Sequence, residues 1–215
     1  MEHRGRRSYT AVLVTLFGVL AIHYSAEAQA PQSTKKEYTQ HVSYVTPEAS
    51  SLAERISRGD AIVRARVLGG EVKGLREVGG ERTQAEPAAA IPDLPDVVTE
   101  SRVRVEEIIK DHDALVAPGG TLSVLQKVGS LETPEYRVRV EEEDYMALQP
   151  GAQYLLFLQW VPDYSRFMLA PDDIFQLDGG AVKSPARGRL GKSLVGKKSD
   201  ELLQNVREAA ASIAK

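Results

Sequence analysis

Apolar and polar residues alternate along several segments of this chain, and no other feature of the sequence restricts its fold as much. The segment 61–68 reads AIVRARVL, so that apolar residues occupy every odd position and arginines occupy two even ones. The same alternation appears in SRVRVE at 101–106, inside a longer strand predicted over 97–109, and in YRVRVE at 136–141. Because successive side chains of a strand point to opposite faces, these segments predict strands with one buried face.

The run YLLFL at 154–158 is apolar on both faces, which predicts a fully buried central strand. Shorter strands are predicted at 121–128, 167–170 and 174–177, and Asp178-Gly179-Gly180 follows the last of them as a hairpin turn. The pattern as a whole indicates a mainly β protein.

Helices are predicted on both sides of this β-rich region. The first is expected over 47–58, with Thr46 as its N-cap, Pro47 at its first position and Gly59 at its end. The second is expected over 200–213 after the N-cap Ser199. Its apolar residues share one face, so the helix should pack on the β domain; they are Leu202, Leu203, Val206, Ala210 and Ile213.

The N-terminal 28 residues have the composition of a secretory signal peptide, with arginines at 4, 6 and 7, an apolar run at 11–22 and small residues at 26 and 28. Cleavage is predicted after Ala28, because cleavage after Ala30 would place Pro31 next to the cut. The alternative is an uncleaved anchor, although the apolar stretch 8–24 is shorter than the ~20 residues that span a bilayer. We therefore expect an exported protein, periplasmic or extracellular, without a membrane span after cleavage.

The chain contains no cysteine, which excludes disulfides, thiolate metal sites and a lipid-modified N-terminus. Packing and hydrogen bonds must therefore hold together a chain long enough for one domain. Without the predicted signal peptide, 24 basic and 28 acidic residues remain. This acidic balance argues against nucleic acid as a partner.

Three polar segments divide the chain. Residues 29–46 are expected to form a flexible leader, 74–96 a mobile insertion within the β domain and 183–198 a basic linker. The expected organisation is therefore a barrel domain with its leading helix over 47–182, then the linker, then a C-terminal helix over 199–215.

The linker is the most basic segment of the chain and contains no acidic residue. Its cations are Lys183, Arg187, Arg189, Lys192, Lys197 and Lys198. They could attract anionic envelope polymers or lipid headgroups. The alternative, which we favour, is a solvated linker before the last helix. The fragment Gly191-Lys192-Ser193 is not a phosphate-binding loop, because the glycine required five residues earlier is Ala186.

Aromatic residues concentrate between 136 and 175. Trp160, Tyr164 and Phe167 surround a predicted turn and could form an exposed stacking platform for sugars or bases. The alternative, which we favour, is that they pack in the core.

No catalytic, cofactor-binding or metal-binding motif is present in the sequence. His41 lies in the leader and His112 in a polar turn, so both are expected at the surface. The acidic runs 141–144 and 172–173 lack the spacing of a calcium loop and are interpreted as solvated hairpin tips. A carboxylate pair for glycoside cleavage is not excluded by sequence.

The order of these segments resembles the OB-like barrel of the netrin-like family, which includes the tissue inhibitors of metalloproteinases (NTR/TIMP-like). GDAIVRARV at 59–67 is similar to the first strand of that family, VRVEEIIK at 103–110 to its second and GAQYLLFL at 151–158 to a later core strand. The resemblance covers about 59–182 and implies a closed or partly open antiparallel barrel. The inhibitors of that family bind the target zinc through an N-terminal cysteine, which this chain lacks.

The resemblance thus implies a small secreted barrel used for macromolecular contact, and not that inhibitory mechanism. We expect a non-enzymatic binding domain whose partner is a protein or a polymer of the cell envelope. The alternative is an envelope enzyme or accessory factor that acts on glycans. A carboxylate pair in a deep, aromatic-lined cleft would favour the alternative, whereas a filled barrel without a cleft would favour the binding domain.

Overall fold

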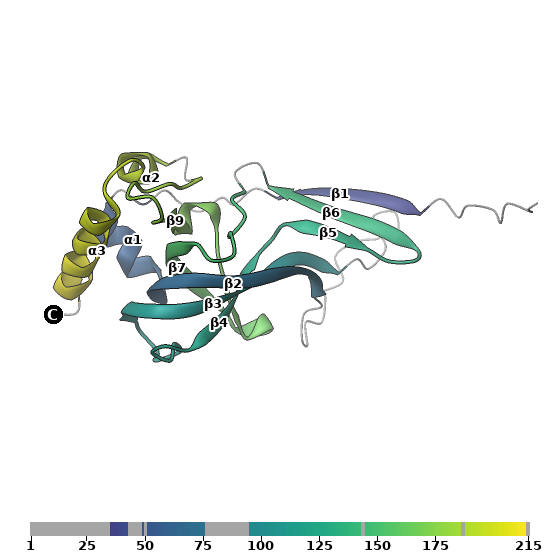
Figure 1. The fold of residues 1–215 in the computed structure, drawn as a ribbon. Coiled ribbons are helices and arrows are strands. Elements are labelled where there is room, and N and C mark those ends of the chain that lie inside the picture. Colours follow the sequence, from purple (N-terminus) through teal and green to yellow (C-terminus); the bar gives the residue numbers. More distant parts are fainter. Residues whose placement is uncertain are drawn as a thin grey trace, which may run out of the picture. The chain divides into compact units, whose positions relative to one another are not determined.

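Two sheets and three short α-helices make up the part of the chain that the computed structural model describes, which is residues 35–42, 49, 51–75, 95–142, 145–185 and 188–213 (Figure 1). The elements in chain order are β1 (Lys36–Val42), α1 (Leu52–Arg58), β2 (Ala61–Leu75), β3 (Asp96–Asp111), β4 (Thr121–Gln126), β5 (Gly129–Glu132), β6 (Tyr136–Glu142), β7 (Gln153–Val161), the 3₁₀ turn η1 (Pro162–Tyr164), β8 (Arg166–Met168), the 3₁₀ turn η2 (Pro171–Asp173), β9 (Ile174–Gln176), α2 (Arg189–Leu194) and α3 (Ser199–Ile213).

The larger sheet runs round on itself to form a ring. β2 pairs with β3 and β3 with β4, both antiparallel, and β4 then pairs with β8 in parallel. β8 pairs with β7, and β7 returns to β2 with Ala61 opposite Leu158. β9 also pairs with β7. One edge of β7 thus pairs with β2, and the other edge pairs with β9 near its start and with β8 near its end. The chain is therefore mainly β, as the alternation predicts.

Side chains fill the inside of the ring. The odd residues of β2, from Ala61 to Val67, are buried, as are Val103 and Val105 of β3. Tyr154, Leu156 and Leu158 of β7 join the same cluster. The strand alternation predicted for 61–67 and 101–106 is thus confirmed, and it places the small apolar residues inside with the arginines of β2 and β3 outside.

The opposite face of β7 forms a second core under the helices. Leu155 and Phe157 point away from the ring interior and pack with Ile62, Phe175 and residues of α1, α2 and α3. α1 and α3 lie against each other on this face (Figure 1). The prediction that the 154–158 run is buried on both faces is therefore confirmed.

The smaller sheet has the order β1-β6-β5, in which β1 and β6 are parallel. Its core contains Val97, Val138 and Val140. β5 packs closely on β2, because a Cβ atom on Gly129 would lie 2.7 Å from a methyl group of Val72. Gly129 also has a φ of 145°, a conformation that residues with a side chain rarely adopt. No strand signal in the sequence indicated β5.

Several expected boundaries are wrong. The leader expected over 29–46 contains β1, since Tyr38 and Val42 find apolar partners on β6. The first helix begins at Leu52 rather than at 47, because the side chain of Ser51 accepts the N–H of Glu54 and caps it there. β2 continues beyond the predicted segment 61–68, through a register shift between Val67 and Gly69, to Leu75.

The C-terminal part differs from the prediction in two ways. The segment expected as a linker contains α2. The hydroxyl of Ser199, the predicted N-cap of α3, donates instead to the carbonyl of Leu177 (2.7 Å). α3 buries Leu202, Leu203 and Val206 as expected, whereas Ile213 is exposed.

The predicted signal peptide lies outside the described residues, as does most of the insertion expected at 74–96. Within the described part of the chain, no helix has the length and apolar character needed to cross a membrane.

Candidate functional site

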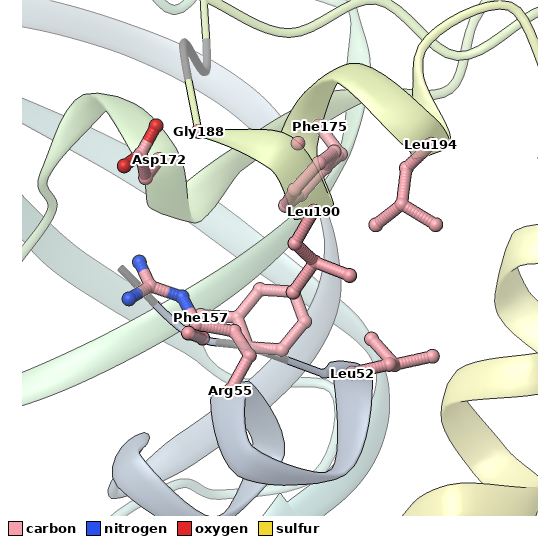
Figure 2. Close-up of a pocket in the computed structure, with 10 residues that line it drawn as sticks. Leu52, Arg55, Phe157, Asp172, Phe175, Gly188, Leu190 and Leu194 are labelled. Carbon is pink, nitrogen blue, oxygen red and sulfur yellow. The ribbon is translucent and has the colours of Figure 1, made fainter. Parts of the chain in front are cut away.

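A small apolar pocket lies between α1, α2 and the outer face of β7 (Figure 2). Leu52, Phe157, Phe175, Leu190 and Leu194 supply its apolar lining. Figure 2 shows the polar residues Arg55 and Asp172 at one end of this lining and Leu52 and Leu194 at the other. The cavity has a volume of about 20 Å³, which is room for one molecule of the size of water.

A buried ion pair adjoins this pocket. The guanidinium of Arg55 donates through Nη2 to Oδ1 of Asp173, and the two side chains are only 5% and 1% exposed. The backbone N–H of Ala170 also donates to Oδ2 of Asp173 (3.3 Å). The guanidinium lies 6.0 Å from the centre of the Phe157 ring, where its charge is attracted to the ring face. The pair thus ties α1 to η2.

Burial dominates the protonation of this pair. Loss of water raises the pKa of Asp173 to about 7, and the neighbouring Arg55 opposes this rise without cancelling it. Nε of Arg55 is buried as well, and it has no hydrogen-bond acceptor among the described residues. The pocket therefore offers one unsatisfied donor beside apolar walls, which suits a water molecule or a small apolar group that carries an acceptor.

The interpretation of 172–173 as a solvated tip is wrong for Asp173, which is among the most buried charged residues. Two adjacent acidic residues after a proline usually indicate a solvated turn, and the partner that changes this comes from α1. Arg55 carries no signal of its own in the sequence. The other predicted acidic run, 141–144, is described only in part, and Glu141 forms ion pairs with His41 and Arg139 at the surface.

α2 separates the pocket from a basic surface. Leu190, Gly191 and Leu194 face the pocket, whereas Arg189 and Lys192 are exposed on the other side of the same helix. Two segments at the ends of this region, 180–183 and 196–199, run antiparallel, and Ala181 lies opposite Lys198. This pairing brings the two ends of the basic segment together.

The exposed cations of this surface, which we call the basic cluster, are Lys183, Arg189, Lys192 and Lys198. Lys197 is partly buried and lies 3.8 Å from Glu201. Arg187, the remaining predicted site residue of the segment, lies outside the described residues. Lys183 and Lys198 thus lie on the two paired segments, whereas Arg189 and Lys192 lie on α2, so the predicted basic residues come from three short elements and not from one extended linker.

The three aromatic residues predicted as a stacking platform lie in two different clusters. Phe167 is 2% exposed and meets Trp160 edge to face inside the ring, with ring centres 5.1 Å apart. Tyr164 packs on a separate cluster with Leu125 and Met168, and its hydroxyl donates to Asp96 (2.6 Å). This arrangement agrees with the core-packing interpretation.

A larger hollow of about 650 Å³ lies on the smaller sheet and is lined by His41, Glu141, Glu142 and Tyr145, among others. Glu141 and Glu142 are consecutive on β6, so their side chains point to opposite faces. Burial raises the pKa of Tyr145. Neither this hollow nor the apolar pocket combines a carboxylate pair with several aromatic residues.

Metal ligands do not cluster in this structure: among the described residues, no three histidine, aspartate or glutamate side chains come together in a way that could hold an ion. No protein-family model matches the chain, and no curated protein is significantly similar to it.

Proposed function

We propose that this protein is an exported, non-enzymatic binding domain built on an OB-like barrel. In the proposed barrel, β2, β3, β4, β7 and β8 are the five strands. The first pairs with the fourth to close the ring, and the third and fifth form the one parallel pair among them. Such a five-stranded Greek-key ring is the arrangement of OB-like barrels. The segments that resemble the netrin-like family fall on β2, β3 and β7.

The filled interior of the ring is what carries the proposal of a binding domain. Residues from every strand of the ring occupy the space that a ligand would need in a larger barrel. The ring then serves as a rigid support, and binding takes place on its surface and on the segments attached to it.

The basic cluster is the surface that we propose for binding, and the ligand class is an anionic polymer of the cell envelope. In the paired segments 180–183 and 196–199, Lys198 lies opposite Ala181, two positions before Lys183. Because side chains alternate between the two faces of the pair, Lys183 and Lys198 share one face, and both are exposed. Within the described residues, neither forms an ion pair with a carboxylate. Several cations on one face attract a polyanion through long-range Coulomb forces.

Binding of dextran sulfate, with neutral dextran as the matched ligand, tests this proposal. Affinity for dextran sulfate should fall steeply between about 50 and about 200 mM salt, because bound cations release counterions from the polymer. The double substitution Lys183→Glu with Lys198→Glu should weaken binding at least about tenfold at the lower salt concentration.

The matched control reverses two exposed arginines on the outer face of β3, Arg102→Glu with Arg104→Glu. Loss of binding in this control alone would move the site to the outer face of the ring. Equal affinity for both dextrans would contradict a polyanion ligand. Export is tested separately, by fractionating cells of a Gram-negative host that produce the full chain with a C-terminal tag and sequencing the N-terminus of the product.

A further inference from the structure

The outer edge of β1 carries backbone groups that no described residue pairs with. In the order β1-β6-β5, β1 is terminal, and no other described strand pairs with it. The N–H of Lys36 donates to the carbonyl of Glu135 beside β6. Because backbone groups alternate in direction along a strand, Glu37, Thr39 and His41 direct theirs away from β6.

Among the described residues, β1 has charged side chains at its edge, Lys36 and Glu37, but no proline, bulge or covering segment. Such edges are commonly blocked by a proline, by a bulge or by a covering segment, since they otherwise act as templates for further pairing. β1 contains no proline, and its register with β6 is unbroken over seven residues from Lys36 to Val42. Most of its side chains are exposed, and only Tyr38 and Val42 are partly buried.

From these features we infer that β1 pairs with β1 of a second copy of this chain. A two-fold axis perpendicular to the strands makes such a pair antiparallel. With the axis at Thr39, all seven residues pair, and the outward-directed residues meet one another: Thr39 meets Thr39 of the second copy, and Glu37 meets His41. Thr39 then forms a hydrogen-bonded pair that exchanges two backbone bonds across the axis.

Charge complementarity favours this register over its neighbours. Within one copy, Glu37 lies 3.3 Å from Arg137 and His41 lies 3.7 Å from Glu141, each pair directly in register on β1 and β6. The two-fold pairing extends each of these side-chain pairs into a row of four residues. One row contains Arg137 and Glu37 of the first copy, followed by His41 and Glu141 of the second copy, and the other row is its symmetry mate. Acidic and basic side chains therefore alternate across four strands, and the alternation of charge is complete when His41 is protonated. A shift by two residues places Glu37 opposite Thr39 and breaks both rows.

The pairing joins two small sheets into one sheet of six strands. It adds backbone hydrogen bonds and few apolar contacts, so the association is weak and depends on concentration. It does not involve the basic cluster, and its failure would leave the proposed binding function unaffected.

Single-cysteine variants test the register directly, because the chain has no cysteine of its own. In Thr39→Cys, the two Cα atoms at the axis lie about 5.5 Å apart, within the range of about 4.4–6.8 Å that a disulfide spans. The matched control is Glu37→Cys on the same exposed edge, where the two copies of position 37 lie about 14 Å apart. Under mild oxidation at about 100 μM protein, we expect covalent dimer at least about tenfold faster from Thr39→Cys than from Glu37→Cys.

Sedimentation velocity without a cross-link gives the second test. The average mass should rise with concentration, and Thr39→Pro should lower the association constant at least about tenfold, since proline removes an outward N–H. Thr39→Val is its control and should associate like the parent. His41→Lys should preserve association, whereas His41→Glu should weaken it. Equal cross-linking at positions 37 and 39, or a monomeric mass at all concentrations, would overturn the inference.

Discussion

Asp173 and Glu132 both accept hydrogen bonds from an arginine, yet their pKa values move in opposite directions. Asp173 lies in the core beside the ring, where burial raises its pKa to about 7 despite the contact with Arg55. Glu132 ends β5 in the smaller sheet, where Lys35 (2.5 Å) and Arg137 (2.8 Å) lower its pKa to about 2. The same pairing chemistry therefore has opposite effects at the two sites.

The difference arises from water. An exposed carboxylate keeps its hydration, so that each cationic partner adds to the stability of the charged form. A carboxylate that is 1% exposed has lost its hydration, and one guanidinium does not replace it. The helix-covered side of the ring is thus held by close packing around a costly charge pair, whereas the smaller sheet carries its ion pairs at the surface.

The largest expected effect comes from breaking the buried pair. Arg55→Met removes the cation that opposes the rise in the pKa of Asp173 and should cost about 3–5 kcal/mol of unfolding free energy at about pH 8. Asp173→Asn should cost less, because the amide resembles the protonated carboxyl, which the raised pKa makes the form favoured on folding. Urea unfolding of both variants measures this difference, and a greater loss in Asp173→Asn would contradict it.

Replacing the whole pair should have a different outcome from breaking it. The pKa of Asp173 is higher in the folded state than its ordinary value of 3.8, so folded protein binds this proton more tightly. Its contribution to stability is therefore fully present below about pH 4 and is lost as the pH rises to about 7, by a few kcal/mol.

The double substitution Arg55→Met with Asp173→Leu should remove this decline and leave the stability at neutral pH equal to that of the parent or higher. Unfolding free energies measured at intervals between pH 4 and 8 provide the comparison. A decline of unchanged slope in the double variant would assign it to other groups.

A smaller effect is expected in the core of the smaller sheet. Val138→Ala removes two buried methyl groups and should cost about 2 kcal/mol. Amide hydrogen exchange should then accelerate in β1, β5 and β6 and remain slow in the ring, if the smaller sheet opens separately. Uniform acceleration in both sheets would show that they unfold as one unit.

The smallest effect is expected at Glu132. Its pKa is lower in the folded state than its ordinary value of 4.5, so its contribution is present above that pH and is lost as the pH falls toward 2. Because the side chain is exposed, salt should screen this contribution. NMR titration of the Glu132 carboxyl should show a rise in pKa after Lys35→Ala, whereas Glu71→Gln, a charge change on β2, should leave it unchanged.

The strands of the ring were predictable because their signal is local. The alternation in 61–67 and 101–106 identifies the strands and their inner faces without knowledge of their partners. β1 was not predictable in this way, since its two apolar residues become a buried face only through β6, about a hundred residues later. The start of α1 was missed because Thr46-Pro47 and Ser51 are both good helix-start signals, and only the structure distinguishes them.

The candidate site was predictable in its charge and not in its geometry. The basic residues can be identified from the sequence alone, and Lys183 and Lys198 are exposed in the structure, as expected. The pairing of residues 181 and 198 depends on a turn at Gly196, with a φ of 83°, and on α2, which the linker interpretation did not include. The burial of Asp173 depends on a partner more than a hundred residues earlier.

The pairing of β2 with β7 also determines when this protein can acquire its fold. Ala61 meets Leu158, so the strand that completes the ring leaves the ribosome roughly a hundred residues after the strand that it joins, a delay of about 5–20 s. Until then β2 and β3 form an open hairpin without the inner side chains of β7. Such long-range pairing makes folding slow, and the nascent chain must stay unassembled, and available to chaperones, for most of its synthesis.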